Sequence, residues 1–134
     1  MFGPAGHTYI YMIYGMHYCL NIVAEKEKFS VTVLIRTIKP IDNIDVMKRY
    51  RNYKILKDKN IVNSPGMLCQ VLKISKLLNG INLLSDQLWI EDAKIKLIAK
   101  DIIQAKKVGI DYAGAGKNLL RRFYIKDNKC ISKK

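Results

Sequence analysis

Tyrosine is the residue type most able to do chemistry in this chain, and four tyrosines lie between Thr8 and Asn21: Tyr9, Tyr11, Tyr14 and Tyr18. A tyrosine ring can stack on a nucleic-acid base, which contributes about 1–3 kcal/mol per base. A large side chain at an exposed turn can also enter a duplex as a wedge and help to flip a nucleotide out. The segment therefore predicts a surface that contacts nucleic acid.

Tyrosine also forms strands well, and an aromatic face often covers a core. We expect this role for Tyr9 and Tyr18. Tyr11 and Tyr14 have opposite side-chain parity, so one buried face cannot hold both of them. At least one of these two rings is therefore predicted to be exposed.

Few other side chains could act in catalysis. His7 and His17 lack the spacing of a zinc site, and Cys19 has no evident orienting group, so we expect a small buried thiol rather than a nucleophile. Arg36 lies in an apolar run, where an unpaired charge is costly. It either pairs with an acidic residue in the core or points into a site, and the sequence leaves both open.

The composition favours a polyanionic partner. Twenty-four Lys/Arg against 11 Asp/Glu give 134 residues a net charge of +13. The basic segment 49–60 is either a solvated face or a track for phosphates. Three widely separated cysteines argue against a disulfide framework and fit a reducing, cytoplasmic location. No apolar run reaches the ~20 residues of a membrane span.

Alternation and turn residues predict mainly strands with two short helices, an α+β fold in one domain. The residues from Thr8 to Asn21 form a hairpin that turns at Tyr14-Gly15-Met16. One helix follows a cap at Asp42 or Asp45 and runs through Val46–Arg51. Another begins at Asn63-Ser64-Pro65 and stops at Asn79-Gly80. Further strands are predicted at Ser30–Ile38, Ser85–Glu91, Lys94–Ala99 and Arg121–Ile125, with an edge near Cys130-Ile131.

Five segments together resemble a known family: MFGPAGHTYIYMIYGMHYCLN, VLIRTIKP, NSPGMLCQVLKI, KKVGI and RRFYI. In this order, from residue 1 to about residue 132, they resemble the alkyladenine (3-methyladenine, or methylpurine) DNA glycosylases. The resemblance implies a curved antiparallel sheet with short helices and a protruding hairpin. It also implies a monomeric base-excision repair enzyme that hydrolyses alkylated purines from double-stranded DNA without metal or cofactor.

The resemblance assigns roles by position. Tyr11 resembles the tyrosine that stacks on the flipped base, and Asn21 the amide that disfavours the amino group of guanine. Arg36 resembles the arginine that holds the attacking water. The pocket floor corresponds to Val108 and Gly109. The residues assigned to DNA contact are Tyr14, which intercalates, its neighbours Met16 and His17, and Lys76.

The family's general-base glutamate lies upstream of the segment that resembles MFGPAG, and neither Glu25, Glu27 nor Glu91 sits in a matching context. We therefore expect a chain truncated at its N-terminus, nucleoid-associated in use, that binds DNA weakly and does not excise bases at an enzymatic rate. A non-catalytic DNA- or RNA-binding remnant is the alternative. A basic RNA-associated protein is a third possibility.

Overall fold

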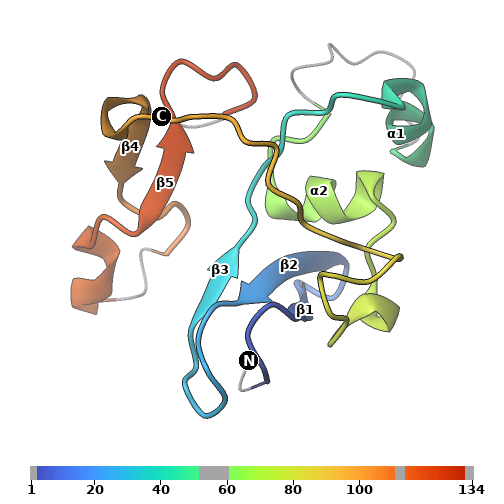
Figure 1. Cartoon of the computed structure of the whole chain (residues 1–134), viewed down its shortest axis with the longest axis horizontal. Coiled ribbons are helices and arrows are strands. Elements are labelled where there is room, and N and C mark those ends of the chain that lie inside the picture. The colour runs from blue at the N-terminus through green and yellow to red at the C-terminus, as the bar shows by residue number, and fades with distance from the viewer. Residues whose placement is uncertain (1–2, 52–60, 111–113, 132–134) are drawn as a thin grey trace. The chain divides into compact units, whose positions relative to one another are not determined.

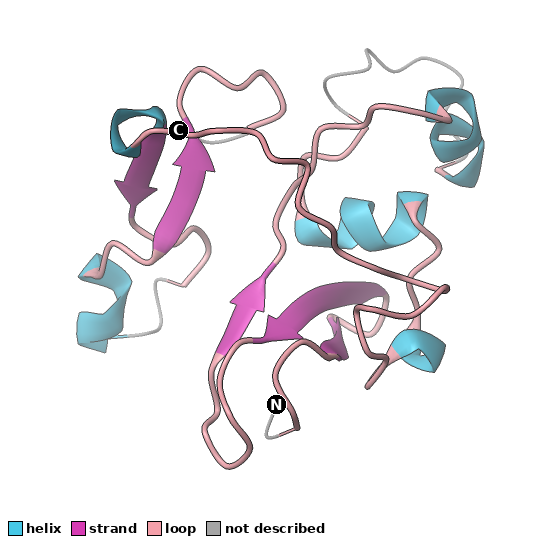
Figure 2. Ribbon diagram, in the orientation of Figure 1, coloured by secondary structure: helices cyan, strands magenta, loops and turns pink. Residues whose placement is uncertain are grey.

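The computed structural model describes residues 3–51, 61–110 and 114–131. Its contacts divide the chain into two compact units, Met1–Glu91 and Asp92–Lys134. The described residues contain two α-helices, short 3-10 helices and two antiparallel sheets, which confirms the α+β class (Figures 1 and 2). No helix in these described ranges is long and apolar enough to cross a membrane.

The predicted hairpin is confirmed. Strand β1 spans Thr8–Ile13 and β2 spans His17–Val23, and they pair antiparallel from Thr8 opposite Ile22 to Ile13 opposite His17. At the turn, the Met16 N–H donates to the Ile13 carbonyl at 3.2 Å. Tyr14 and Gly15 both have positive φ, 52° and 67°, as a type I′ turn requires. The twist of this turn matches that of the strands, so it holds Tyr14 outward.

The third strand is shorter than predicted. β3 spans only Thr32–Leu34 within the predicted Ser30–Ile38, and it pairs with Asn21–Val23 of β2. One further bond joins the Ile35 N–H to the Leu20 carbonyl at 3.0 Å. The chain then leaves β2, because the Thr37 hydroxyl donates to the Val62 carbonyl instead. Arg36 therefore follows the strand rather than lying inside it.

The two α-helices lie where the capping residues and proline predict them, but their first and last residues differ from the prediction. α1 spans Ile44–Tyr50, and its N-cap is Asn43 in a left-handed conformation rather than Asp42 or Asp45. α2 spans Pro65–Val71 with Ser64 as N-cap, as predicted; the Met67 N–H donates to the Ser64 hydroxyl at 3.4 Å.

α2 ends eight residues before the predicted stop at Asn79-Gly80. The Ile74 N–H bonds the Cys69 carbonyl at 2.7 Å and the Lys73 N–H bonds the Gln70 carbonyl at 3.2 Å, a Schellman motif. Lys73 takes the positive φ of 51° that usually calls for glycine, and its ammonium lies 4.2 Å from the centroid of the Tyr50 ring. A separate 3-10 helix, η2, then spans Lys76–Leu78.

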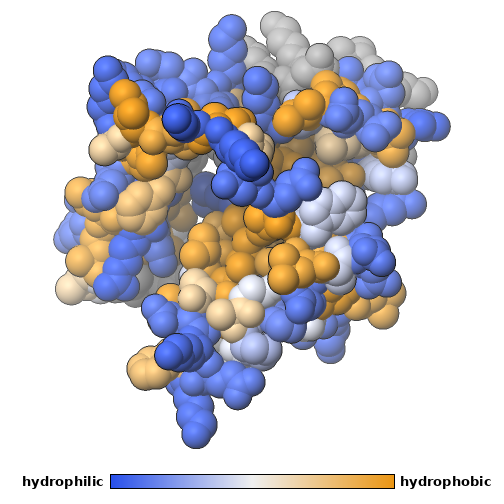
Figure 3. Space-filling model, in the orientation of Figure 1, coloured by the Kyte–Doolittle hydropathy of each residue, from blue (hydrophilic) through white to orange (hydrophobic). Residues whose placement is uncertain are grey.

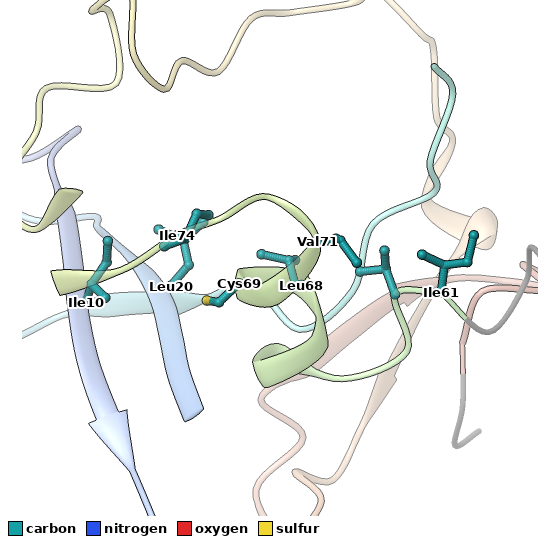
Figure 4. Packing of buried hydrophobic residues seen from close by; sticks show 8 residues of the cluster. Ile10, Leu20, Ile61, Leu68, Cys69, Val71 and Ile74 are labelled. Carbon is teal, nitrogen blue, oxygen red and sulfur yellow. The ribbon is translucent and has the colours of Figure 1, made fainter. Parts of the chain in front are cut away.

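The core of the first unit lies between α2 and the hairpin. Eight buried residues form it: Ile10, Leu20, Ile61, Val62, Leu68, Cys69, Val71 and Ile74 (Figure 4). Tyr18 packs against this cluster, which confirms its predicted role, whereas Tyr9 lies outside it. Arg51 is also buried, and its guanidinium donates to the Ile61 carbonyl at 2.9 Å. Arg51 therefore has a structural role, and the rest of the basic segment (52–60) lies outside the described residues.

The second unit contains a two-stranded ribbon. β4 (Ile102–Ala105) pairs antiparallel with β5 (Arg122–Ile125). β5 confirms the predicted strand at Arg121–Ile125, while β4 was missed. The 3-10 helices η3 (Ala99–Asp101) and η4 (Gly114–Asn118) flank this ribbon.

Three other strand predictions are wrong. Ser85–Glu91 forms no strand; within it, only Trp89 makes a β-bridge, an isolated one to Leu84. In Lys94–Ala99, the Asp92 carboxylate accepts from the Lys94 N–H at 2.8 Å. The Asn128 side chain accepts from the Cys130 N–H at 2.9 Å. Short polar side chains compete in this way with a strand ladder, and they favour turns.

Candidate nucleic-acid interface

Strand register brings two predicted site residues, Tyr11 and Asn21, to one face of the first sheet. Tyr11 lies opposite Cys19, Tyr9 opposite Asn21, and Asn21 opposite Leu34. Arg36 comes two residues after Leu34, beyond the end of β3, and its charge acts on Cys19 of this face. We call Tyr9, Tyr11, Cys19, Asn21 and Arg36 the aromatic face.

Each side chain of the aromatic face is held differently. Tyr11 is 37% exposed, and its ring centroid lies 5.5 Å from that of Tyr9 at an interplanar angle of 37°. Asn21 is only 4% exposed, and its Nδ2 donates to the Tyr9 carbonyl at 3.1 Å. The same Nδ2 also donates to the Cys19 carbonyl at 3.4 Å. A buried amide whose nitrogen donates to two backbone oxygens has a fixed orientation.

Cys19 is a buried thiol that both Tyr11 and Arg36 influence. Burial raises the pKa of the Cys19 thiol above its ordinary value, while a hydrogen bond with the Tyr11 side chain and the charge of Arg36 lower it. Tyr11 and Arg36 therefore both favour the ionised form of this thiol, against the effect of burial. Cys19 is 2% exposed, as expected for a small buried residue.

The buried thiols give a prediction about reactivity. Burial, followed by the nearby Cys19, raises the pKa of Cys69 to about 11. Since the thiolate is the nucleophile, we expect iodoacetamide at pH 8 to modify the half-buried Cys130 rapidly, and Cys19 and Cys69 only in denaturant. Because unfolded thiols ionise first, stability should also fall as pH rises from 9 towards 11. Mass spectrometry of samples taken over time measures the order in which the three cysteines are alkylated. Equal alkylation rates at all three would contradict the expected order.

The hairpin tip is an exposed, partly apolar projection. Tyr14 is 86% exposed and Met16 is 70% exposed. His17 is exposed too, and α2 begins against it: a Cβ added to Gly66 would lie 3.2 Å from the His17 side chain. The prediction that at least one of Tyr11 and Tyr14 is exposed is confirmed.

Three other predicted residues lie elsewhere. Lys76 is exposed on η2, which packs beside the first half of β1; there the Asn79 side chain accepts from the Ile10 N–H at 2.7 Å. Val108 and Gly109 belong to the second unit, and their role in a pocket stays a prediction. A hollow of about 480 Å³ lined by Leu83, Leu84, Trp89 and Ile90 includes none of the predicted site residues.

The strands that carry the aromatic face lack acidic side chains. None of the strands β1, β2 and β3 contains Asp or Glu. Glu25 and Glu27 are exposed on the turn between β2 and β3, and Glu91 is exposed at the end of the first unit. No group of three or more His, Cys, Asp or Glu side chains suited to a metal occurs among the described residues.

Sequence reasoning missed one member of this face. Tyr9 was assigned to the core, but its ring is half-buried and lies against Tyr11. The spacing of two residues between Tyr9 and Tyr11 was the available signal, because it places both rings on one side of a strand.

Comparison with known proteins identifies the family of this chain. The family model of methylpurine-DNA glycosylase matches residues 1–129. The chain therefore belongs to the methylpurine-DNA glycosylase family. This result confirms the resemblance found in the sequence.

Relatives of this chain are named "Putative 3-methyladenine DNA glycosylase", and three of them illustrate the similarity. The protein from Clostridium acetobutylicum is 46% identical over 138 residues, which cover 98% of this chain and 66% of the relative. The protein from Alkaliphilus oremlandii is 41% identical, covering 100% and 68%. The protein from Methanocella arvoryzae is 40% identical, covering 100% and 66%. The chain thus spans about two thirds of the length of these relatives.

Proposed function

We propose that this chain acts in DNA base-excision repair by recognising alkylated purines flipped out of double-stranded DNA. The single observation that carries the proposal is the hairpin. It presents Tyr14, 86% exposed, at its tip and places Tyr11 on a face with Asn21 and Arg36. A wedge and a stacking surface on one rigid element suit an extrahelical nucleotide. The match of the family model to both units supports a single domain over residues 1–134.

The proposed substrate suits the chemistry of the aromatic face. A purine methylated at N3 or N7 is cationic, so its glycosidic bond is weak and the electron-rich ring of Tyr11 attracts it. In hydrolysis, water adds to C1′ and loses a proton, the C1′–N bond breaks, and the base leaves neutral. Arg36 would hold this water. Asn21 would exclude the extra amino group of guanine, because its bonds to the backbone prevent it from moving aside.

A second candidate is recognition without hydrolysis. The observation that favours it is the lack of Asp or Glu on the three strands of the first sheet, since a carboxylate is the usual acceptor for the proton of an attacking water. In this alternative, the chain binds the lesion or the abasic product but does not release a base.

Tyr14→Ala tests the proposed recognition. We expect the preference for a duplex with an abasic site over an intact duplex to fall about tenfold, since the stacking of one aromatic ring is lost. Fluorescence anisotropy with labelled duplexes measures both affinities. Met12→Ala is the matched control, because Met12 is 49% exposed on the same hairpin but lies within β1, opposite Tyr18, rather than in the turn. Tighter binding of structured RNA than of abasic DNA by the unsubstituted chain would contradict the proposal.

The same preparations separate the two candidates. Release of 3-methyladenine from alkylated DNA by the unsubstituted chain, abolished by Arg36→Ala, would support hydrolysis. Retained preference for the abasic duplex without release would support recognition alone.

A further inference from the structure

Positive charge is concentrated in the second unit. Asp92–Lys134 is less than a third of the chain but carries twelve Lys/Arg against four Asp, a net +8 of the total +13. Apart from Val108 and Gly109, the proposed function uses none of these residues. The surface over the ribbon mixes hydrophilic and hydrophobic residues (Figure 3).

The ribbon gathers several cations at one end. Ala105, the last residue of β4, lies opposite Arg122, the first residue of β5. Lys106 and Lys107 therefore extend one strand where Arg121 precedes the other. The Lys106 ammonium donates to the Asn118 side chain at 2.9 Å, which brings η4 and its Lys117 to the same place. We define the basic end by these five residues: Lys106, Lys107, Lys117, Arg121 and Arg122.

Both signs of charge lie at the opposite end of the ribbon, where Lys100 and Lys126 accompany Asp101 and Asp127. Asp101 directly precedes β4 and Asp127 follows β5 by two residues; the Lys126 N–H bonds the Asp101 carbonyl at 2.8 Å. Four residues of strand separate the two ends, roughly 13 Å at the usual rise. This separation exceeds the Debye length of about 8–10 Å at physiological salt, so the acids screen the basic end only weakly.

The basic end itself is free of carboxylates within the described stretches 102–110 and 114–126, which contain no Asp or Glu. Lys106, Lys107, Lys117 and Arg121 are exposed. The Arg122 guanidinium lies 4.9 Å from the centroid of the Tyr124 ring, which restricts its position. Several exposed cations held on a short ribbon suit a partner with repeated negative charges, since each phosphate neutralised releases counterions.

We propose that the basic end binds the phosphate backbone of double-stranded DNA as a second contact, separate from the hairpin tip. The choice of DNA as the polyanion rests on the proposed function. The charge distribution itself does not depend on that function. Such a contact strengthens binding to damaged and undamaged duplexes equally, because phosphates carry no information about the base.

The test is a triple variant, Lys107→Gln/Lys117→Gln/Arg121→Gln, measured on an intact duplex over a range of salt concentrations. We expect the slope of log K against log salt to become shallower by about 2–3, near 0.9 for each lost phosphate contact. The matched control, Lys94→Gln/Lys96→Gln/Lys129→Gln, removes the same charge from exposed positions of the same unit and should change the slope much less. Equal changes in both triple variants would overturn the proposal.

Two further measurements make the outcome clear. A charge-preserving variant, Lys107→Arg/Lys117→Arg/Arg121→Lys, should keep the slope of log K against log salt unchanged. A shallower slope in this variant would mean that the substitutions act through the fold rather than through charge, and it would overturn the proposal. The ratio of affinities for abasic and intact duplexes should not change in the glutamine variant. If the unsubstituted chain binds abasic and intact duplexes equally well, the proposed function fails. The salt dependence of binding to the intact duplex still tests the basic end in that case. A larger loss for structured RNA than for duplex DNA would overturn the choice of DNA.

Discussion

Replacing Asn21 by Asp is expected to lower the free energy of unfolding by about 3 kcal/mol or more, although the two side chains have nearly the same shape. Asn21 is 4% exposed, and its Nδ2 faces the Tyr9 and Cys19 carbonyl oxygens at 3.1 and 3.4 Å. A carboxylate there would bring a third oxygen with negative charge against two acceptors. Urea unfolding followed by circular dichroism measures the loss.

The effect of Asn21→Asp should depend on pH. Burial favours the protonated carboxyl group, so the pKa of the new group lies above that of the unfolded chain, about 3.9. Stability is therefore highest below that value and is lost as pH rises. Asn79→Asp is the control: Asn79 accepts from the Ile10 N–H at 2.7 Å through Oδ1, an interaction that a carboxylate can also make. If both variants lose the same stability, the amide of Asn21 has no special structural role.

Leu68→Ala is the second substitution expected to lower the free energy of unfolding strongly. Leu68 is 0% exposed on α2 within the core cluster (Figure 4). The truncation should cost about 2–5 kcal/mol, the lost transfer free energy together with a cavity term. Since typical domains are stable by only about 5–15 kcal/mol, the variant should unfold at a clearly lower urea concentration.

The matched control for Leu68→Ala is Leu77→Ala on η2, since Leu77 is 90% exposed. That substitution should change stability by less than about 0.5 kcal/mol. A similar loss in both variants would mean that the cluster around α2 does not form the core of the first unit.

Asn21 lies on β2, and Leu68 belongs to the cluster that packs against β2 through Leu20. This one strand therefore contributes to both the core and the aromatic face. Cys19, Leu20 and Asn21 are consecutive and all buried. Leu20 points into the cluster beneath α2, while Cys19 and Asn21 point to the opposite side, as strand alternation requires. The core therefore fixes the strand from which Asn21 and the hairpin tip project. A site that must distinguish one base from another needs such a rigid support.

Local chemistry is visible in a sequence, and the elements that depend on it were predicted well. Tyr14-Gly15 could adopt the positive φ angles of a tight hairpin turn, and Ser64-Pro65 could begin a helix. Arg121–Ile125 was correctly predicted as a strand because β-branched and aromatic residues favour one. β4 has the same length as β5 but was not predicted; it is defined by its pairing with β5.

The sequence by itself determined the family, the hairpin with its tyrosines and the excess of positive charge, because motifs and charges are properties of the residue types. Only the tertiary structure decided that Tyr9 lies against Tyr11, that Arg36 follows β3 rather than lying inside it, and that Arg51 is buried. It also brought Lys106, Lys117 and Arg122 to one end of the ribbon. These outcomes depend on strand register and on competition for backbone hydrogen bonds between segments far apart in the chain, which no local pattern records.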